Sequence, residues 1–194
     1  MGQNDFVSFF FYGRYSNIVH RKEVYFLEDI YVGFSTLDYE RSCKKKIPVN
    51  EEELLAELGV KSEKDIQVVI SWFPANINVE GLSLNKMNAY YYILEELYGT
   101  PMYDNLEELL KAGKNMGLFH NIEEMFLMRK KMTFHEGVTN TESLMEKRLY
   151  TEYPQLKELP DRIMKYFDFC RMSNDMRKGY YYLYTSKGIF EVKK

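Results

Sequence analysis

Strand-type segments lie toward the two ends of this chain, and the segment between them has helical periodicity. Phe, Tyr, Val and Ile are frequent in residues 6–12 and 23–36, and again in residues 180–185 and 189–192. From residue 84 to about residue 130, apolar side chains instead recur every three or four positions. The pattern predicts an α+β fold with an N-terminal antiparallel sheet and helix, a central helical segment, and C-terminal helices plus a hairpin.

Capping residues, glycines and prolines divide the chain into short elements. Asn50 before Glu51 predicts a helix start, and Gly59 predicts the end of that helix. A turn or bulge is expected at Glu28 and Asp29. Further helices are expected over 84–98, 104–112, 121–130, 140–149 and 160–169, strands over 66–73 and 132–135, and a hairpin turn at 186–188. These elements predict three domains, at residues 1–74, 75–117 and 118–194.

Charge is distributed unevenly along the chain. The whole sequence has 26 basic and 29 acidic residues, a net charge of −3. Residues 51–124 contain 5 basic and 14 acidic residues, a net charge of −9, whereas residues 125–194 contain 14 basic and 9 acidic residues, a net charge of +5. Such asymmetry is typical of a protein with a partner surface of one sign.

Residue patterns of common catalytic and cofactor sites are sparse. The glycines form no phosphate-binding loop, and neither Cys43 nor Cys170 has a second cysteine or a histidine at ligand spacing. The only histidines are His20, His120 and His135, each expected to be a surface or structural residue. We therefore expect no enzyme, no cofactor and no metal. An enzyme would require the fold to bring histidines and carboxylates together in a pocket.

The chain also lacks the hydrophobic segment that a membrane span needs and the basic leader of a signal peptide. We expect a cytoplasmic protein without a membrane partner.

A series of short motifs closes the chain. Leu159-Pro160 is followed by Tyr166-Phe167-Asp168-Phe169, then by Gly179-Tyr180 and by Gly188-Ile189-Phe190-Glu191. This order resembles the end of ArdA-type antirestriction proteins, where a proline-led helix carries a Y-[FI]-D-[YF] element before a hairpin. Similarity continues through residues 30–194, at segments 48–54, 63–73, 84–97, 121–124 and 134–137.

The resemblance implies an elongated chain of three small α+β and α domains that pairs into a curved homodimer. Members of the family mimic bent B-form DNA and occupy the DNA-binding groove of type I restriction-modification enzymes. It therefore implies a non-enzymatic inhibitor of such an enzyme, in the cytoplasm of the host bacterial cell. Nothing in the sequence names the target, so a CRISPR nuclease or another DNA-handling complex stays open as an alternative. Direct binding of nucleic acid is not expected of a mimic.

Carboxylates in the central segment are the candidate phosphate mimics. Duplex DNA carries one charge per ~3.4 Å along each strand, whereas acids three or four residues apart on a helix repeat about every 5 Å. The residues that approach this density are Glu95, Glu96, Asp104, Glu107, Glu108, Glu123 and Glu124. An ordinary solvated helix face has the same pattern of acidic residues. The sequence is therefore consistent both with such a face and with DNA mimicry.

The basic C-terminal third departs from the acidic character of the family. It includes the runs Arg129-Lys130-Lys131, Lys147-Arg148 and Arg177-Lys178. A basic segment would repel the basic groove that a DNA mimic fills. Either mimicry is confined to the centre of the chain or the target differs. The alternative function is a nucleic-acid- or protein-binding accessory factor of a phage or mobile element that uses this third.

Overall fold

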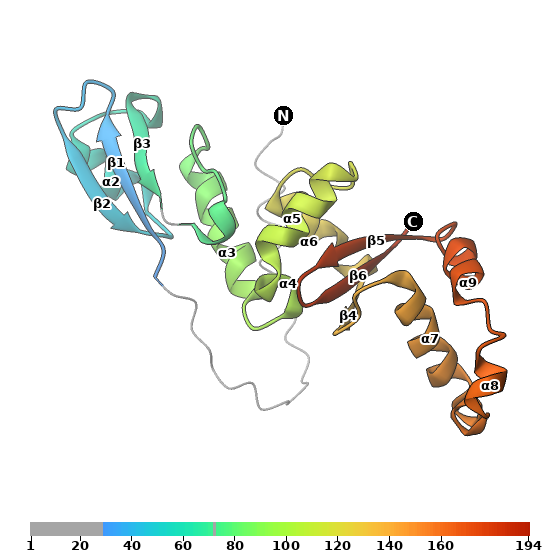
Figure 1. Cartoon of the computed structure of the whole chain (residues 1–194). Helices are drawn as coiled ribbons and strands as arrows, with labels where there is room; N and C mark the ends of the chain where they lie inside the picture. The colour runs from blue at the N-terminus through green and yellow to red at the C-terminus, as the bar shows by residue number, and fades with distance from the viewer. Residues whose placement is uncertain (1–28, 72) are drawn as a thin grey trace.

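The computed structural model describes residues 29–71 and 73–194 (Figure 1). Within them, a sheet with one helix, a group of central helices, and a second sheet with its own helices follow one another along an elongated body. The mixed α+β class expected from the sequence is confirmed. Several expectations fall outside the described residues: the strand over residues 6–12, residues 23–28 of the run expected over 23–36, His20, and residue 72 of the strand expected over 66–73.

The N-terminal sheet has three antiparallel strands in the order β2-β1-β3. They are β1 (Tyr31–Thr36), β2 (Ser42–Lys46) and β3 (Ile66–Ser71). The β1–β3 pairing shifts register between Gly33 and Phe34. Strand β2 was not predicted from the sequence, because its residues are mostly lysine, which has a low strand propensity. Lysines are common on edge strands because their charge opposes pairing with another chain.

One helix packs with this sheet, α2 (Glu51–Leu58). The Asn50 side chain accepts a hydrogen bond from the main-chain N–H of Glu53, and Gly59 adopts a left-handed conformation with φ of 66°. Both ends of the helix therefore lie where the capping residues predicted them. A short 3₁₀ turn, η1 (Glu63–Asp65), precedes β3.

The central part is helical. It consists of η2 (Pro74–Asn76), α3 (Leu84–Leu97), α4 (Pro101–Asp104), α5 (Leu106–Asn115), α6 (Ile122–Met128) and η3 (Arg129–Lys131). The single helix predicted over residues 104–112 is wrong at its start. Asn105 has φ of −121° and ψ of 17°, which separates α4 from α5, and its side chain donates to the carbonyl of Pro101 at 2.7 Å.

The C-terminal sheet is antiparallel in the order β4-β6-β5. Its elements are β4 (Met132–Glu136), α7 (Thr141–Glu152), η4 (Pro154–Glu158), α8 (Asp161–Met164), α9 (Phe169–Met176), β5 (Tyr180–Thr185) and β6 (Gly188–Lys193). The strand predicted over residues 132–135 and the hairpin predicted with its turn at residues 186–188 are confirmed. The helix predicted from Pro160 through Phe169 is instead divided, because Asp168 caps a new helix by accepting from the N–H of Arg171.

Both faces of the C-terminal sheet are covered. Leu183, Phe190 and Val192 on one face belong to a large cluster of buried side chains that begins at Ile30 and crosses residues 74 and 117, the predicted domain boundaries. On the other face, Tyr182 and Ile189 pack with Leu144 and Met145 of α7 in a smaller cluster. Alternation of side chains along a strand explains the two-sided burial. The sheet therefore lies between the central helices and the α7–α9 arm (Figure 1).

In the described part of the chain, no helix combines the length and the apolar composition needed to cross a bilayer.

Candidate acidic interface

The seven candidate carboxylates lie on four central helices. Glu95 and Glu96 lie in the last turn of α3, and Asp104 is the last residue of α4. The pairs Glu107-Glu108 and Glu123-Glu124 occupy the first turns of α5 and α6. All except the half-buried Glu123 are exposed. Carboxylates in a first helical turn also stabilise the helix by opposing the positive end of its dipole, so four of the seven have a local structural role.

Two of the carboxylates are compensated by cations. Glu123 lies 3.4 Å from the ammonium of Lys86, and Glu96 lies 3.3 Å from the guanidinium of Arg129. The first pair joins the first turns of α3 and α6, and the second joins the last turn of α3 to the residue after α6. These pairs bridge α3 and the end regions of α6, and the compensated carboxylates add little to the negative field of the surface.

Glu107 and Glu108 are held by neutral donors instead. The side-chain amide of Asn76 donates to Glu107 Oε1 at 3.1 Å. Ser186, in the turn between β5 and β6, donates to Glu108 from its hydroxyl at 2.7 Å and also from its main-chain N–H. The hydroxyl and then the N–H of Ser186 lower the pKa of Glu108, which keeps this carboxylate charged.

Glu124 is fixed in the same way at the start of α6. Its carboxylate accepts from the main-chain N–H of His120 at 2.7 Å and from the side-chain amide of Asn121 at 3.3 Å. Asn121 in turn caps α6 by accepting from the N–H of Glu124 at 2.9 Å. Within the described residues, the side chains of Glu95 and Asp104 make no hydrogen bond or ion pair.

Five carboxylates therefore have no ion-pair partner in residues 29–71 and 73–194: Glu95, Asp104, Glu107, Glu108 and Glu124. Three of the five are fixed in position by hydrogen bonds that leave the negative charge in place. The structure thus distinguishes the three carboxylates that are held by hydrogen bonds and remain charged from the two carboxylates that form ion pairs within the chain. Local sequence could indicate the capping role of Glu124, but not the contacts of Glu107 and Glu108 with distant residues.

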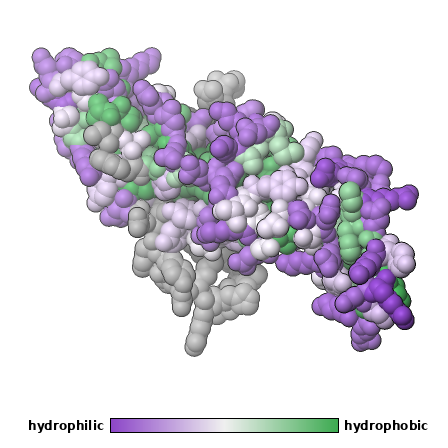
Figure 2. Space-filling model, viewed as in Figure 1, coloured by the Kyte–Doolittle hydropathy of each residue, from purple (hydrophilic) through white to green (hydrophobic). Residues whose placement is uncertain are grey.

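The basic residues of the C-terminal third also form two groups, those that contact another side chain and those that form no ion pair. Arg148 contacts Glu191, Arg177 donates to the Thr141 hydroxyl, and Lys178 pairs with Asp175. Lys130, Lys131 and Lys147 are exposed and form no ion pair within the part of the chain that the structure describes. Figure 2 shows hydrophilic side chains over much of the visible face of this third.

Histidine and carboxylate meet at one place in the C-terminal sheet. Glu191 is 2% exposed and lies 3.0 Å from Nε2 of His135, and its other contact is the guanidinium of Arg148 on α7. This network was not predicted, although a carboxylate between Phe190 and Val192 in an apolar strand is a signal for a paired, buried charge. Its burial between sheet and helix favours a structural role. No group of three potential metal-ligating side chains occurs in the described residues.

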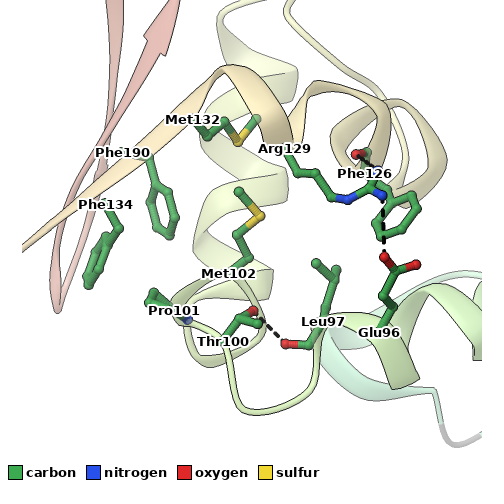
Figure 3. Close-up of a pocket in the computed structure, with 10 residues that line it drawn as sticks. All are labelled: Glu96, Leu97, Thr100, Pro101, Met102, Phe126, Arg129, Met132, Phe134 and Phe190. Atoms are coloured by element: carbon green, nitrogen blue, oxygen red, sulfur yellow. Dashed lines mark hydrogen bonds and ion pairs between the residues drawn. The ribbon is translucent and has the colours of Figure 1, made fainter. Parts of the chain in front are cut away.

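A cavity of about 380 Å³ opens where the central helices meet the C-terminal sheet (Figure 3). Its walls include Leu97, Met102, Met132, Phe134 and Phe190, with Arg129 on one side. These residues come from five separate elements, so no sequence motif could have predicted the cavity.

Comparisons with protein-family models and with curated protein sequences find no match to this chain. The fold and the surface chemistry define a mixed α+β protein with an acidic helical centre and a basic C-terminal third.

Proposed function

We propose that this protein is a non-enzymatic anti-defence protein that presents carboxylates in place of DNA phosphates and so inhibits a bacterial DNA-targeting enzyme. A type I restriction-modification enzyme is the first candidate for the target, and a CRISPR nuclease is another. The observation that carries the proposal is the hydrogen bonding of Glu107, Glu108 and Glu124 by neutral donors. Their charges are fixed in place and not neutralised.

Fixed charge is what a protein surface needs to replace a duplex. Phosphates of DNA are held by a semi-rigid backbone, and they position the duplex on a protein. A free glutamate side chain would lose rotamer freedom on binding, whereas a carboxylate that is already held loses less. The elongated body and the order of the closing motifs, which resemble ArdA-type proteins, support the same proposal.

The proposal extends to the setting in which the protein acts. It acts in the cytoplasm of the host bacterial cell as a homodimer, without a cofactor. The homodimer and the host bacterial cell derive from the resemblance in the C-terminal motifs, whereas the lack of a cofactor derives from the sparse cofactor motifs of the sequence.

The test is ATP-dependent cleavage of unmodified DNA by a type I restriction enzyme, with and without the purified protein. The variant Glu107→Gln/Glu124→Gln removes two fixed, unpaired charges, and the matched control Glu96→Gln/Glu123→Gln removes two charges that are already compensated. Glutamine keeps an acceptor oxygen, so both variants should fold. We expect near-stoichiometric inhibition by the native chain, a loss of at least about tenfold in the first variant, and little change in the second.

Three outcomes would count against the proposal. Absence of inhibition by the folded native chain rejects a type I enzyme as target, and the assay is then repeated with a CRISPR nuclease. Full inhibition by a variant with Gln at Glu95, Glu96, Glu107 and Glu108 rejects phosphate mimicry by these residues. Equal losses of inhibition in the two double variants indicate that the total negative charge of the surface determines inhibition, and not the hydrogen-bonded carboxylates in particular.

Exposed cations favour a second candidate, the nucleic-acid-binding accessory factor. Lys130, Lys131 and Lys147 have no ion-pair partner among the described residues and are available to contact phosphates. Tight, salt-sensitive binding of plain duplex DNA by the native chain, lost in Lys130→Gln/Lys131→Gln, would support this candidate. A DNA mimic should not bind duplex DNA.

A further inference from the structure

The cavity at the junction of the central helices and the C-terminal sheet is separate from the unpaired carboxylates described above. Its volume of about 380 Å³ lies within the range of about 300–1,000 Å³ typical of small-molecule sites. Such sites are mostly apolar and contain a few polar groups that orient the ligand. This cavity has the same composition, with apolar side chains on several walls and Arg129 as its cation (Figure 3).

The apolar walls suit a flat ring. Phe134 and Phe190 lie with ring centroids 4.6 Å apart, and both line the cavity. Met102 and Met132 lie near them in Figure 3, from α4 and β4 respectively. Thioether sulfur is polarisable and makes favourable contacts with aromatic rings, and unbranched methionine adapts to ligand shape. A planar aromatic group is therefore the chemistry that these walls fit.

Arg129 supplies the polar contact. Its guanidinium lies over the Phe126 ring at 3.5 Å from the centroid, donates to the Phe126 carbonyl at 2.9 Å, and donates to Glu96 at 3.3 Å. A guanidinium has more N–H donors than these two bonds use. The side chain of Glu96 is 60% exposed, and an exposed ion pair of this kind contributes little stability. An anionic group of a ligand could therefore share or replace Glu96 on Arg129 at small cost.

We infer that this cavity binds a small planar aromatic compound with one carboxylate or similar anionic group. The ring lies against Met102, Met132 and the Phe134–Phe190 pair, and the anionic group contacts Arg129. The inference does not depend on the proposed inhibition of a nuclease, because the lining cation and apolar side chains are distinct from the five unpaired carboxylates.

The test is a titration of the full chain, labelled with ¹³C at the methionine methyl groups, with naphthalene-2-carboxylate. We expect saturable shifts of the Met102 and Met132 methyl signals, while the signal of Met145, in the smaller buried cluster, does not move. The neutral analogue 2-naphthylmethanol should bind about tenfold more weakly, because it lacks the charge-assisted hydrogen bond to Arg129. The cationic analogue 2-naphthylmethylammonium should bind more weakly still.

Three variants separate recognition of the anion from apolar adsorption. Glu96→Gln removes the competing carboxylate and should tighten binding of naphthalene-2-carboxylate about threefold while leaving binding of the alcohol unchanged. Arg129→Gln should abolish the preference for the carboxylate. Lys130→Gln removes a neighbouring positive charge that does not line the cavity, and it should change neither affinity.

The inference is overturned if neither naphthalene compound shifts the Met102 and Met132 signals saturably at millimolar concentration. It is also overturned if the carboxylate and the alcohol bind equally well to the native chain, or if Met145 responds as strongly as the cavity methionines. None of these readouts involves a nuclease, so they are independent of the inhibition assay.

Discussion

Ser186 holds Glu108 through two donors, its hydroxyl at 2.7 Å and its main-chain N–H, although the two residues are 78 positions apart in the sequence. The contact joins the first turn of α5 to the tip of the β5–β6 hairpin and thus the helical centre to the C-terminal sheet. It fixes one of the proposed phosphate mimics, and the bond from the hydroxyl can be removed by a single substitution.

Ser186→Ala should raise the pKa of Glu108 toward its ordinary value of 4.5, because the hydroxyl is the largest cause of its lowering. A carboxyl whose pKa is lowered by folding contributes stability above its unfolded pKa and loses that contribution as pH falls through the folded pKa. The variant should therefore be less stable than the native chain at pH 7 and equally stable in acid. Urea unfolding at both pH values and the ¹³C titration of the Glu108 carboxyl measure this.

Ser42→Ala is the matched control, since Ser42 is exposed on β2 and makes no side-chain hydrogen bond within the described residues. A stability difference between the native chain and Ser186→Ala that persists unchanged in acid would show that the effect does not come from ionised Glu108.

Salt should weaken inhibition if the unpaired carboxylates bind a basic groove. Each carboxylate that contacts a cation of the groove should add to the loss of affinity with salt, because salt screens exposed charge pairs. Glu107→Gln/Glu124→Gln should therefore make inhibition less dependent on salt, and Glu96→Gln/Glu123→Gln should leave the dependence nearly unchanged. Inhibition constants measured over a series of NaCl concentrations test this, and inhibition by the native chain that does not depend on salt would contradict electrostatic mimicry.

Arg148→Met should destabilise the C-terminal sheet by about 3 kcal/mol, because it removes a cation from the buried carboxylate of Glu191. Lys147→Met, one residue earlier on the exposed side of α7, should change the free energy of unfolding by less than about 0.5 kcal/mol. Chemical denaturation of both variants provides the comparison. Similar small effects in both would mean that the Arg148–Glu191 contact contributes little to stability.

Gly113→Ala should destabilise the central helices despite the higher helix propensity of alanine. A Cβ at this position would meet the ring of Phe119, which is fully buried. Overpacking of a core costs about 1–3 kcal/mol, against a gain of about 1 kcal/mol from propensity. Thermal unfolding should show a lower Tm, and Phe119→Leu in the same chain should reduce the loss. Lys114→Ala, exposed on the same helix, should leave Tm nearly unchanged.

Local chemistry explains why many elements could be predicted. Asn50, Asn121 and Asn140 cap helices through hydrogen bonds that reach only three residues ahead, and the hairpin of β5 and β6 turns through adjacent residues. Caps and turns of this kind depend only on residues a few positions apart, so they can be predicted from the sequence. The predictions were wrong at the lysine-rich strand β2, where pairing with β1 overrides a low strand propensity, and at Asn105, whose hydrogen bond to the Pro101 carbonyl marks the break between α4 and α5.

At the candidate interface, the acidic residues, their helical spacing and the contrast between an acidic centre and a basic end can all be read from the amino-acid sequence. The compensation of Glu96 by Arg129, 33 positions away, and the fixing of Glu108 by Ser186 without neutralisation arise from the three-dimensional fold. The fold also assembles the cavity, by bringing Phe190 of β6 against residues 96–134. Capping and periodicity act within one or two turns of chain, whereas charge compensation and cavities depend on which surfaces the buried core brings together.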